Sequence, residues 1–147
     1  MAVYTSIEDL EKRLDPQVLA GLADDVNPLP DIDDALTRDI IQQAIGDGGS
    51  LVDSYLMGRV DLADPLVMAG LERINATLAL YFLYRRRYVD DSLNPLSASR
   101  EAVESFMAEV ANGNARLGGD PGQPQMAGWS STQDSEGVFD QRKLSGF

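Results

Sequence analysis

The sequence contains no histidine and no cysteine. Without histidine a protein lacks the commonest general base and metal ligand, and without cysteine it has neither a thiol nucleophile nor a disulfide framework. No glycine-rich phosphate loop is present either, because residues 46–49 lie inside a helical pattern and no Lys-Ser/Thr pair follows them. We therefore predict a protein that is not an enzyme and that binds no cofactor and no metal.

Basic residues are scarce as well. Lys and Arg number 12 against 24 Asp and Glu, which gives a formal net charge of -12 at pH 7. Proteins bind duplex DNA through basic groups that displace its counterions. The surface as a whole is therefore not expected to attract DNA.

Long apolar runs are also missing. The most apolar stretch, residues 78–84, is far shorter than the ~20 residues that a membrane span needs. Residues 1–6 have neither a basic leader nor an apolar signal core. We expect a soluble protein that is not secreted and has no membrane partner, and its 147 residues fit one small domain with one core.

What is present is a series of helical patterns, the first two of them short. Thr5 and Glu8 form a capping-box pattern, followed by apolar residues at helical spacing: Ile7, Leu10 and Leu14. The pair Asp15-Pro16 then predicts a second short helix whose core-facing residues are Val18, Leu19 and Leu22. Residues 24–34, rich in aspartate and proline, should form a loop.

The next two helical patterns are long. The first begins after Asp34, and its apolar face comprises Leu36, Ile40, Ile41, Ala44, Ile45, Gly48, Leu51, Val52, Tyr55 and Leu56. Glycines within this pattern either allow a close helix crossing or mark a bend: Gly46, Gly48 and Gly49. The second starts at Asp64-Pro65 and is apolar nearly all round, which predicts the central helix. Its expected buried side comprises Leu66, Ala69, Gly70, Ile74, Thr77, Leu78, Tyr81 and Phe82.

A fourth main helix is predicted after Asn94-Pro95, with Ser97 or Ser99 as its cap and Asn112-Gly113 as its stop. Its apolar face comprises Ala102, Val103, Phe106, Met107 and Val110. The predicted fold is all-α: a small helical bundle of about four main helices plus short helical turns, followed by an extended C-terminal arm.

Two charged clusters have the composition of a binding site. A calcium loop starting at Asp25 would have Pro30 at its sixth position and Leu36 at its twelfth, where glycine and glutamate are needed, so solvation and helix capping explain the aspartates better. The basic run Arg85, Arg86, Arg87 has two interpretations. We favour a helix end that balances its dipole and pairs with carboxylates, and the alternative is a grip on a phosphate or on an acidic surface of a neighbour.

The last segment, residues 118–147, is polar and rich in glycine but carries large apolar side chains without helical or alternating spacing: Trp129, Val138, Phe139, Leu144 and Phe147. It could be a solvated tail. We favour an arm that becomes ordered on a partner, because a purely disordered tail would be poorer in aromatic residues. The predicted organisation is a helical domain at 1–117 and an arm at 118–147.

The order of these features resembles a known family along nearly the whole chain. The resemblance begins with residues 4–10 and continues through Ala44-Ile45, residues 52–56, Asp64-Pro65 and residues 74–79. It ends with residues 101–103, 110–113 and the closing segment 138–147. Together these segments are similar to the Mu-like phage head-completion proteins, which act as head-to-tail connectors. The proline-rich loop at 24–34 departs from the acidic, glycine-containing turn of relatives, so no ion site is carried over.

The resemblance implies a structural protein of the virion, made in the cytoplasm of the host bacterium and placed at the head-tail junction. It would form a homo-oligomeric ring, of twelve copies by analogy, beneath the portal protein, extend the channel for passing genomic DNA without sequence-specific binding, and dock the next neck or tail protein. The partner-binding residues would be the three arginines and the five apolar residues of the arm. The alternative hypothesis is an acidic helical regulatory module of the DNA-mimic or inhibitor type.

Overall fold

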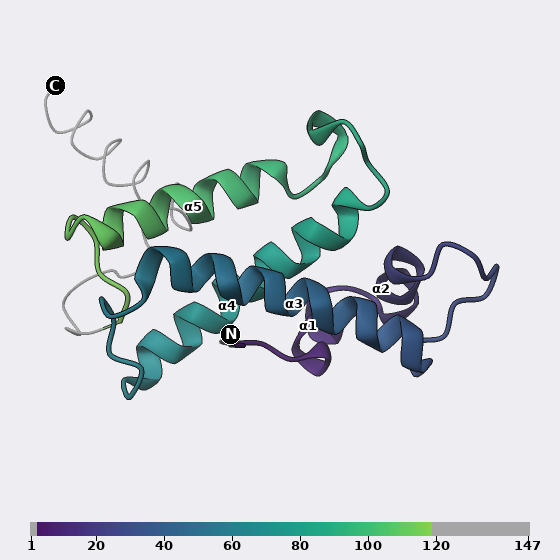
Figure 1. The fold of residues 1–147 in the computed structure, drawn as a ribbon, viewed down its shortest axis with the longest axis horizontal. Helices are drawn as coiled ribbons and strands as arrows, with labels where there is room; N and C mark the ends of the chain where they lie inside the picture. The colour runs from purple at the N-terminus through teal and green to yellow at the C-terminus, as the bar shows by residue number, and fades with distance from the viewer. Residues whose placement is uncertain (1–2, 119–147) are drawn as a thin grey trace, which may run out of the picture.

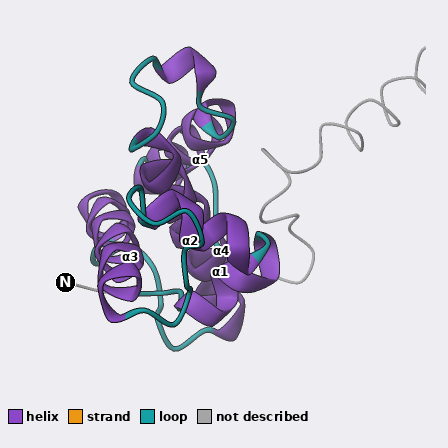
Figure 2. Ribbon diagram, turned by 90° about the vertical axis from the view of Figure 1, so that its right-hand side faces the viewer, coloured by secondary structure: helices purple, strands orange, loops and turns teal. Residues whose placement is uncertain are grey.

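The structure is a computed structural model that describes residues 3–118. These residues form α1 (Ile7–Arg13), α2 (Pro16–Ala23), α3 (Ala35–Leu56), α4 (Pro65–Arg85), the short 3-10 helix η1 (Asp91–Leu93) and α5 (Ser97–Ala111). Within this range the secondary structure is entirely helical, as Figures 1 and 2 show, which confirms the all-α prediction. Three helices are long, and α1 and α2 are the short elements that the sequence predicts.

The helix starts are fixed mainly by aspartates. Asp15, Asp34 and Asp64 each accept a backbone hydrogen bond at the start of a helix, and proline follows Asp15 and Asp64 as predicted. The cap of α1 lies one residue later than predicted, because Ser6 and Asp9 form the capping box instead of Thr5 and Glu8.

The C-terminal end of the described fold differs from the prediction in one detail. Neither Ser97 nor Ser99 caps α5, since Leu96 occupies the N-cap position without a side-chain hydrogen bond. Ser97 instead donates its hydroxyl to the carbonyl oxygen of Asp91. The helix ends at Ala111, and Gly113 then adopts φ +82°, a conformation that glycine accepts without steric cost.

The long helices α3 and α4 cross closely at Gly48. A Cβ atom on Gly48 would lie 2.7 Å from Nδ2 of Asn75 and 3.2 Å from Cβ of Leu78. Asn75 is fully buried and donates from Nδ2 to the carbonyl oxygen of Ile45 at 3.0 Å, while its Oδ1 accepts from the backbone N–H of Tyr4 at 2.9 Å. Of the two alternatives for the glycines, the close crossing is therefore correct at Gly48.

The crossing divides the core into two clusters. One cluster packs α1, α2 and the first half of α3 against the second half of α4, and its fully buried members include Leu10, Leu19 and Ile41. The other packs the second half of α3 and the first half of α4 against α5, with Leu71 and Met107 fully buried. In Figure 1, α5 lies along one side of the α3–α4 pair, and α1 and α2 lie toward the N-terminal end of α3.

Helix α4 is central, as predicted, because it contributes buried residues to both clusters. Judged by length and composition alone, α4 is long and apolar enough to cross a membrane. Its apolar part is therefore longer than the apolar stretch of residues 78–84 seen in the sequence. However, 61% of its most apolar window is buried inside the protein, as expected for the core helix of a packed domain.

Four residues predicted to face the core are exposed instead. Val18 is 45% exposed, and exposed positions are also occupied by Leu36, Leu66 and Ala69. The last three lie near the starts of α3 and α4, where other residues of the same helices, such as Thr37 and Val67, are buried. In α4 the buried face at this end is formed by Val67, Gly70 and Leu71, one position away from the predicted stripe.

Candidate docking surface

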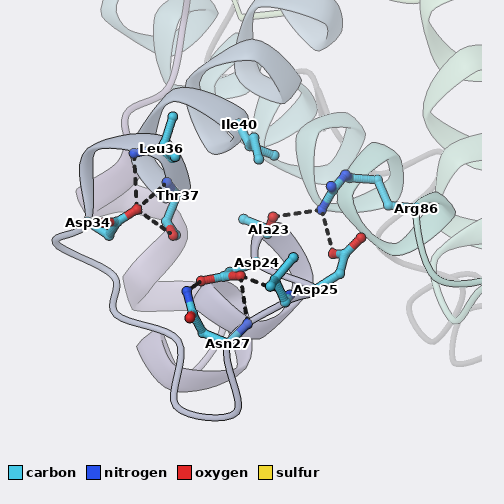
Figure 3. A pocket seen from close by; sticks show the side chains of 10 residues that line it. Ala23, Asp24, Asp25, Asn27, Asp34, Leu36, Thr37, Ile40 and Arg86 are labelled. Atoms are coloured by element: carbon cyan, nitrogen blue, oxygen red, sulfur yellow. Dashed lines mark hydrogen bonds and ion pairs between the residues drawn. The ribbon is translucent and has the colours of Figure 1, made fainter.

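A surface pocket of about 350 Å³ lies where α2, the loop after it, the start of α3 and the end of α4 meet. Its walls come from Ala23 at the end of α2, residues 24–27 of the loop, four residues at the start of α3 and Arg86, the C-cap of α4. Figure 3 shows Leu36 and Ile40 on one side of this hollow and the Arg86 guanidinium on the other. The pocket is thus assembled from residues within the range 23–40 and from Arg86, which is distant from them in sequence.

The apolar part of this pocket is uncovered in the described residues. Val26 is 88% exposed and Leu36 is 73% exposed, and both line the pocket together with the half-buried Ile40. Leu29, in the same loop, is 84% exposed. Grouped apolar side chains that remain in contact with water are characteristic of surfaces that bind a partner. We call the three apolar residues that line the pocket, Val26, Leu36 and Ile40, the apolar wall.

Carboxylates surround the apolar wall and are held in place by local hydrogen bonds. Asp24 accepts from the side chain of Asn27 at 2.6 Å and from the backbone N–H groups of Val26 and Asn27. These bonds, with the side-chain bond from Asn27 as the largest cause, lower the pKa of Asp24 below its usual value. Asp34 caps α3 through the backbone of Leu36 and Thr37. The pocket lining therefore carries ordered negative charge.

Arg86 and Arg87 tie the end of α4 to the end of α2. Nη1 of Arg86 donates to the carbonyl oxygens of Leu22 at 2.6 Å and Ala23 at 2.9 Å, and lies 3.2 Å from Asp25. Arg87 donates to the carbonyl oxygen of Gly21. The last carbonyls of a helix lack partners within the helix, so these guanidinium groups act as its C-terminal cap.

This geometry agrees with the interpretation of the arginine run that we favoured from the sequence. Arg86 and Arg87 bond within the chain, and Arg85 lies near enough to Asp91 to contribute to the lowered pKa of that carboxylate, whose largest cause is the hydrogen bond from Tyr81. Only Arg86 lines the pocket. Binding of a partner by the three arginines stays a prediction.

The apolar wall itself was not identified from the sequence. The spacing of Leu36 and Ile40 predicts that they lie on the buried face of their helix, and it does not distinguish the exposed Leu36 from the buried Ile41. Val26 carries a usable signal, because it is a large apolar residue within a loop of aspartates and prolines. The five predicted anchors of the arm, Trp129, Val138, Phe139, Leu144 and Phe147, lie outside the described residues.

The groups on this surface are suited to non-covalent contact. In the described part of the chain, no group of three or more Asp and Glu side chains is arranged to hold a metal ion. The lining offers an apolar wall, three carboxylates and one guanidinium, which is already bonded within the chain. Such a surface suits a segment that brings apolar side chains and positive charge.

The fold and this surface together define a small, acidic, all-α protein with an exposed, partly apolar pocket. Residues 4–133 match the family described as Bacteriophage Mu, Gp36, and the chain belongs to that family. It is also similar to the Mu-like prophage FluMu protein gp36 of Haemophilus influenzae, with 34% identity over 118 residues that cover 80% of this chain and 77% of the relative. The resemblance to a Mu-like phage family, predicted from the sequence, is thereby confirmed.

Proposed function

We propose that the protein is a structural subunit of the phage virion that completes the filled head and connects it to the tail. Copies would assemble as a ring beneath the portal protein, extend the DNA channel and offer a platform to the next neck or tail protein. Membership of a Mu-like phage family supports this role. It requires no catalytic chemistry, in keeping with a sequence that lacks histidine and cysteine.

The observation that carries the proposal is the exposed apolar wall beside a packed core. Val26 and Leu36 are each more than 70% exposed, although Ile41, in the same helix as Leu36, is fully buried. Water contact of this kind is unfavourable by roughly 25 cal/mol for each Å² of apolar surface. In an assembly, a neighbouring chain can cover this surface and remove it from water.

The acidic regulatory module is less well supported. A protein that mimics DNA would need its carboxylates free and regularly spaced on rigid elements. Here Asp15, Asp34 and Asp64 cap helices, and Asp25 pairs with Arg86. Much of the acidity therefore has a local structural use.

Deleting the gene in its phage tests the connector role. We expect induced cells to produce DNA-filled heads and complete tails that remain separate, as seen by electron microscopy of the lysate. Expression of the full chain from a plasmid should restore joined particles. Joined, infectious particles in the absence of the protein would reject the proposal.

A further inference from the structure

We propose that the pocket of one subunit receives the segment 142–147 of a neighbouring copy, with Leu144 and Phe147 against the apolar wall and Arg142 and Lys143 beside the carboxylates. This inference rests on the proposed function, in which copies of the chain assemble side by side. It names the contact that would join them.

The pocket and the segment 142–147 match in polarity. Val26 and Leu36, at 88% and 73% exposure, lack an apolar cover within residues 3–118. The segment 142–147 places two large apolar residues, Leu144 and Phe147, within four positions of each other. A pocket of about 350 Å³ is large enough to accept one such side chain, and the exposed wall beside it can accept the other.

The charges also match. Arg142 and Lys143 are the only basic residues in the sequence after Arg116. The pocket carries Asp24, Asp25 and Asp34 against one guanidinium, that of Arg86, so its lining stays net negative even though Asp25 pairs with Arg86 and Asp34 caps α3. Hydrogen bonds from Asn27 and Val26 lower the pKa of Asp24. Opposite charges at the edge of an apolar contact select the partner and its orientation. They also offset part of the repulsion between copies that each carry a net charge of -12.

The arm can reach a neighbour. It leaves the described fold at Gly118, where an added Cβ would meet Val67 and Asp64 at the start of α4, whereas the pocket lies at the end of α4. A helix of 21 residues is about 30 Å long. The 24 residue steps from Gly118 to Arg142 can span up to about 80 Å when extended. A subunit that filled its own pocket would hide the apolar wall without joining copies, so we assign the segment to the next subunit.

Disulfide trapping tests this contact without background, because the natural sequence has no cysteine. One full-length variant carries Leu36→Cys and a second, which has a removable tag that changes its mobility on a gel, carries Leu144→Cys. Because free copies are expected to associate weakly, the two are mixed at high protein concentration and oxidised mildly. Each chain has a single thiol, so a mixed dimer on a non-reducing gel reports a contact between two chains and never one within a chain.

Leu66→Cys provides the matched control. Leu36 and Leu66 are both exposed, both are the second residue of a long helix, and each donates its backbone N–H to a capping aspartate. We expect the Leu36→Cys variant to give about tenfold more mixed dimer with Leu144→Cys than the Leu66→Cys variant gives. When the Leu144→Cys chain also carries Arg142→Glu and Lys143→Glu, the yield of mixed dimer with Leu36→Cys should fall about tenfold. Equal yields from the two positions, or a yield that charge reversal leaves unchanged, would overturn the proposal.

The outcome is separable from that of the gene deletion. A failed trapping experiment alongside separate heads and tails in the deletion lysate rejects this contact and leaves the connector role standing. Successful trapping alongside joined particles in the deletion lysate rejects the connector role and leaves the contact between copies standing.

Discussion

Substituting Gly48 by alanine should destabilise the protein, although alanine favours a helix. The new Cβ would lie 2.7 Å from Nδ2 of Asn75, 3.2 Å from Cβ of Leu78 and 3.3 Å from the carbonyl oxygen of Asn75. Asn75 can yield only by giving up its buried hydrogen bonds to Ile45 and Tyr4. A lost buried hydrogen bond costs about 1–3 kcal/mol and overpacking costs a similar amount, against a gain of about 1 kcal/mol in helix propensity. We expect the free energy of unfolding to fall by about 1–3 kcal/mol.

Gly21→Ala is the control for this prediction. Gly21 also lies inside a helix, but a Cβ added there would meet nothing within 4 Å. We therefore expect Gly21→Ala to raise the free energy of unfolding by roughly 0.5–1 kcal/mol. Urea unfolding followed by circular dichroism would compare both variants with the parent chain. If Gly48→Ala were as stable as Gly21→Ala, the close crossing of α3 and α4 would be refuted.

Three further predictions address the arginine run, the N-terminus and the arm. Arg86→Ala should lower the free energy of unfolding by about 1–3 kcal/mol, because it removes the hydrogen bonds that cap the C-terminal end of α2. Arg85→Ala should change the free energy of unfolding by no more than about 0.5 kcal/mol. Equal effects of the two substitutions in urea unfolding would contradict the capping role. Burial, then the hydrogen bond to Asp53 and its charge, raise the pKa of Tyr4 to about 12, so its contribution to stability is complete below pH ~10 and is lost as the pH rises toward 12. Urea unfolding across this range should show a smaller alkaline loss in Tyr4→Phe, and an unchanged loss would contradict the assignment. Truncation after Gly118 should leave helical content and thermal melting nearly unchanged, because residues up to Leu117 form both core clusters. The same truncation should abolish stable incorporation into particles. A truncated chain that unfolds, or one that still assembles, would count against a separate arm.

Much of the helical layout could be predicted from the sequence because its signals are local. The aspartate-proline pairs at Asp15 and Asp64 combine a capping side chain with a residue preset for the first helical turn, and both helices start there. Gly113 similarly marks the end of α5. These signals act within a few residues, so the tertiary fold changes them little.

The pocket could not be predicted in the same way, because it depends on how segments from different helices pack together. Leu36 has the spacing of a core residue, yet it is exposed, while Thr37 beside it in the first turn of α3 is buried. The role of Arg86 likewise depends on α4 ending beside the last carbonyls of α2, more than sixty residues earlier in the chain. Periodicity identifies an apolar face but not the length of that face that is covered.

The most direct test of the connector role is to image the purified protein by negative-stain electron microscopy, alone and mixed with the portal protein of the same phage. Repulsion between copies that each carry a charge of -12 should keep the protein monomeric or weakly associated by itself. Bound to the portal, it should add a ring of density that continues the channel. Portal particles that remain unchanged at saturating protein would contradict the proposed connector role.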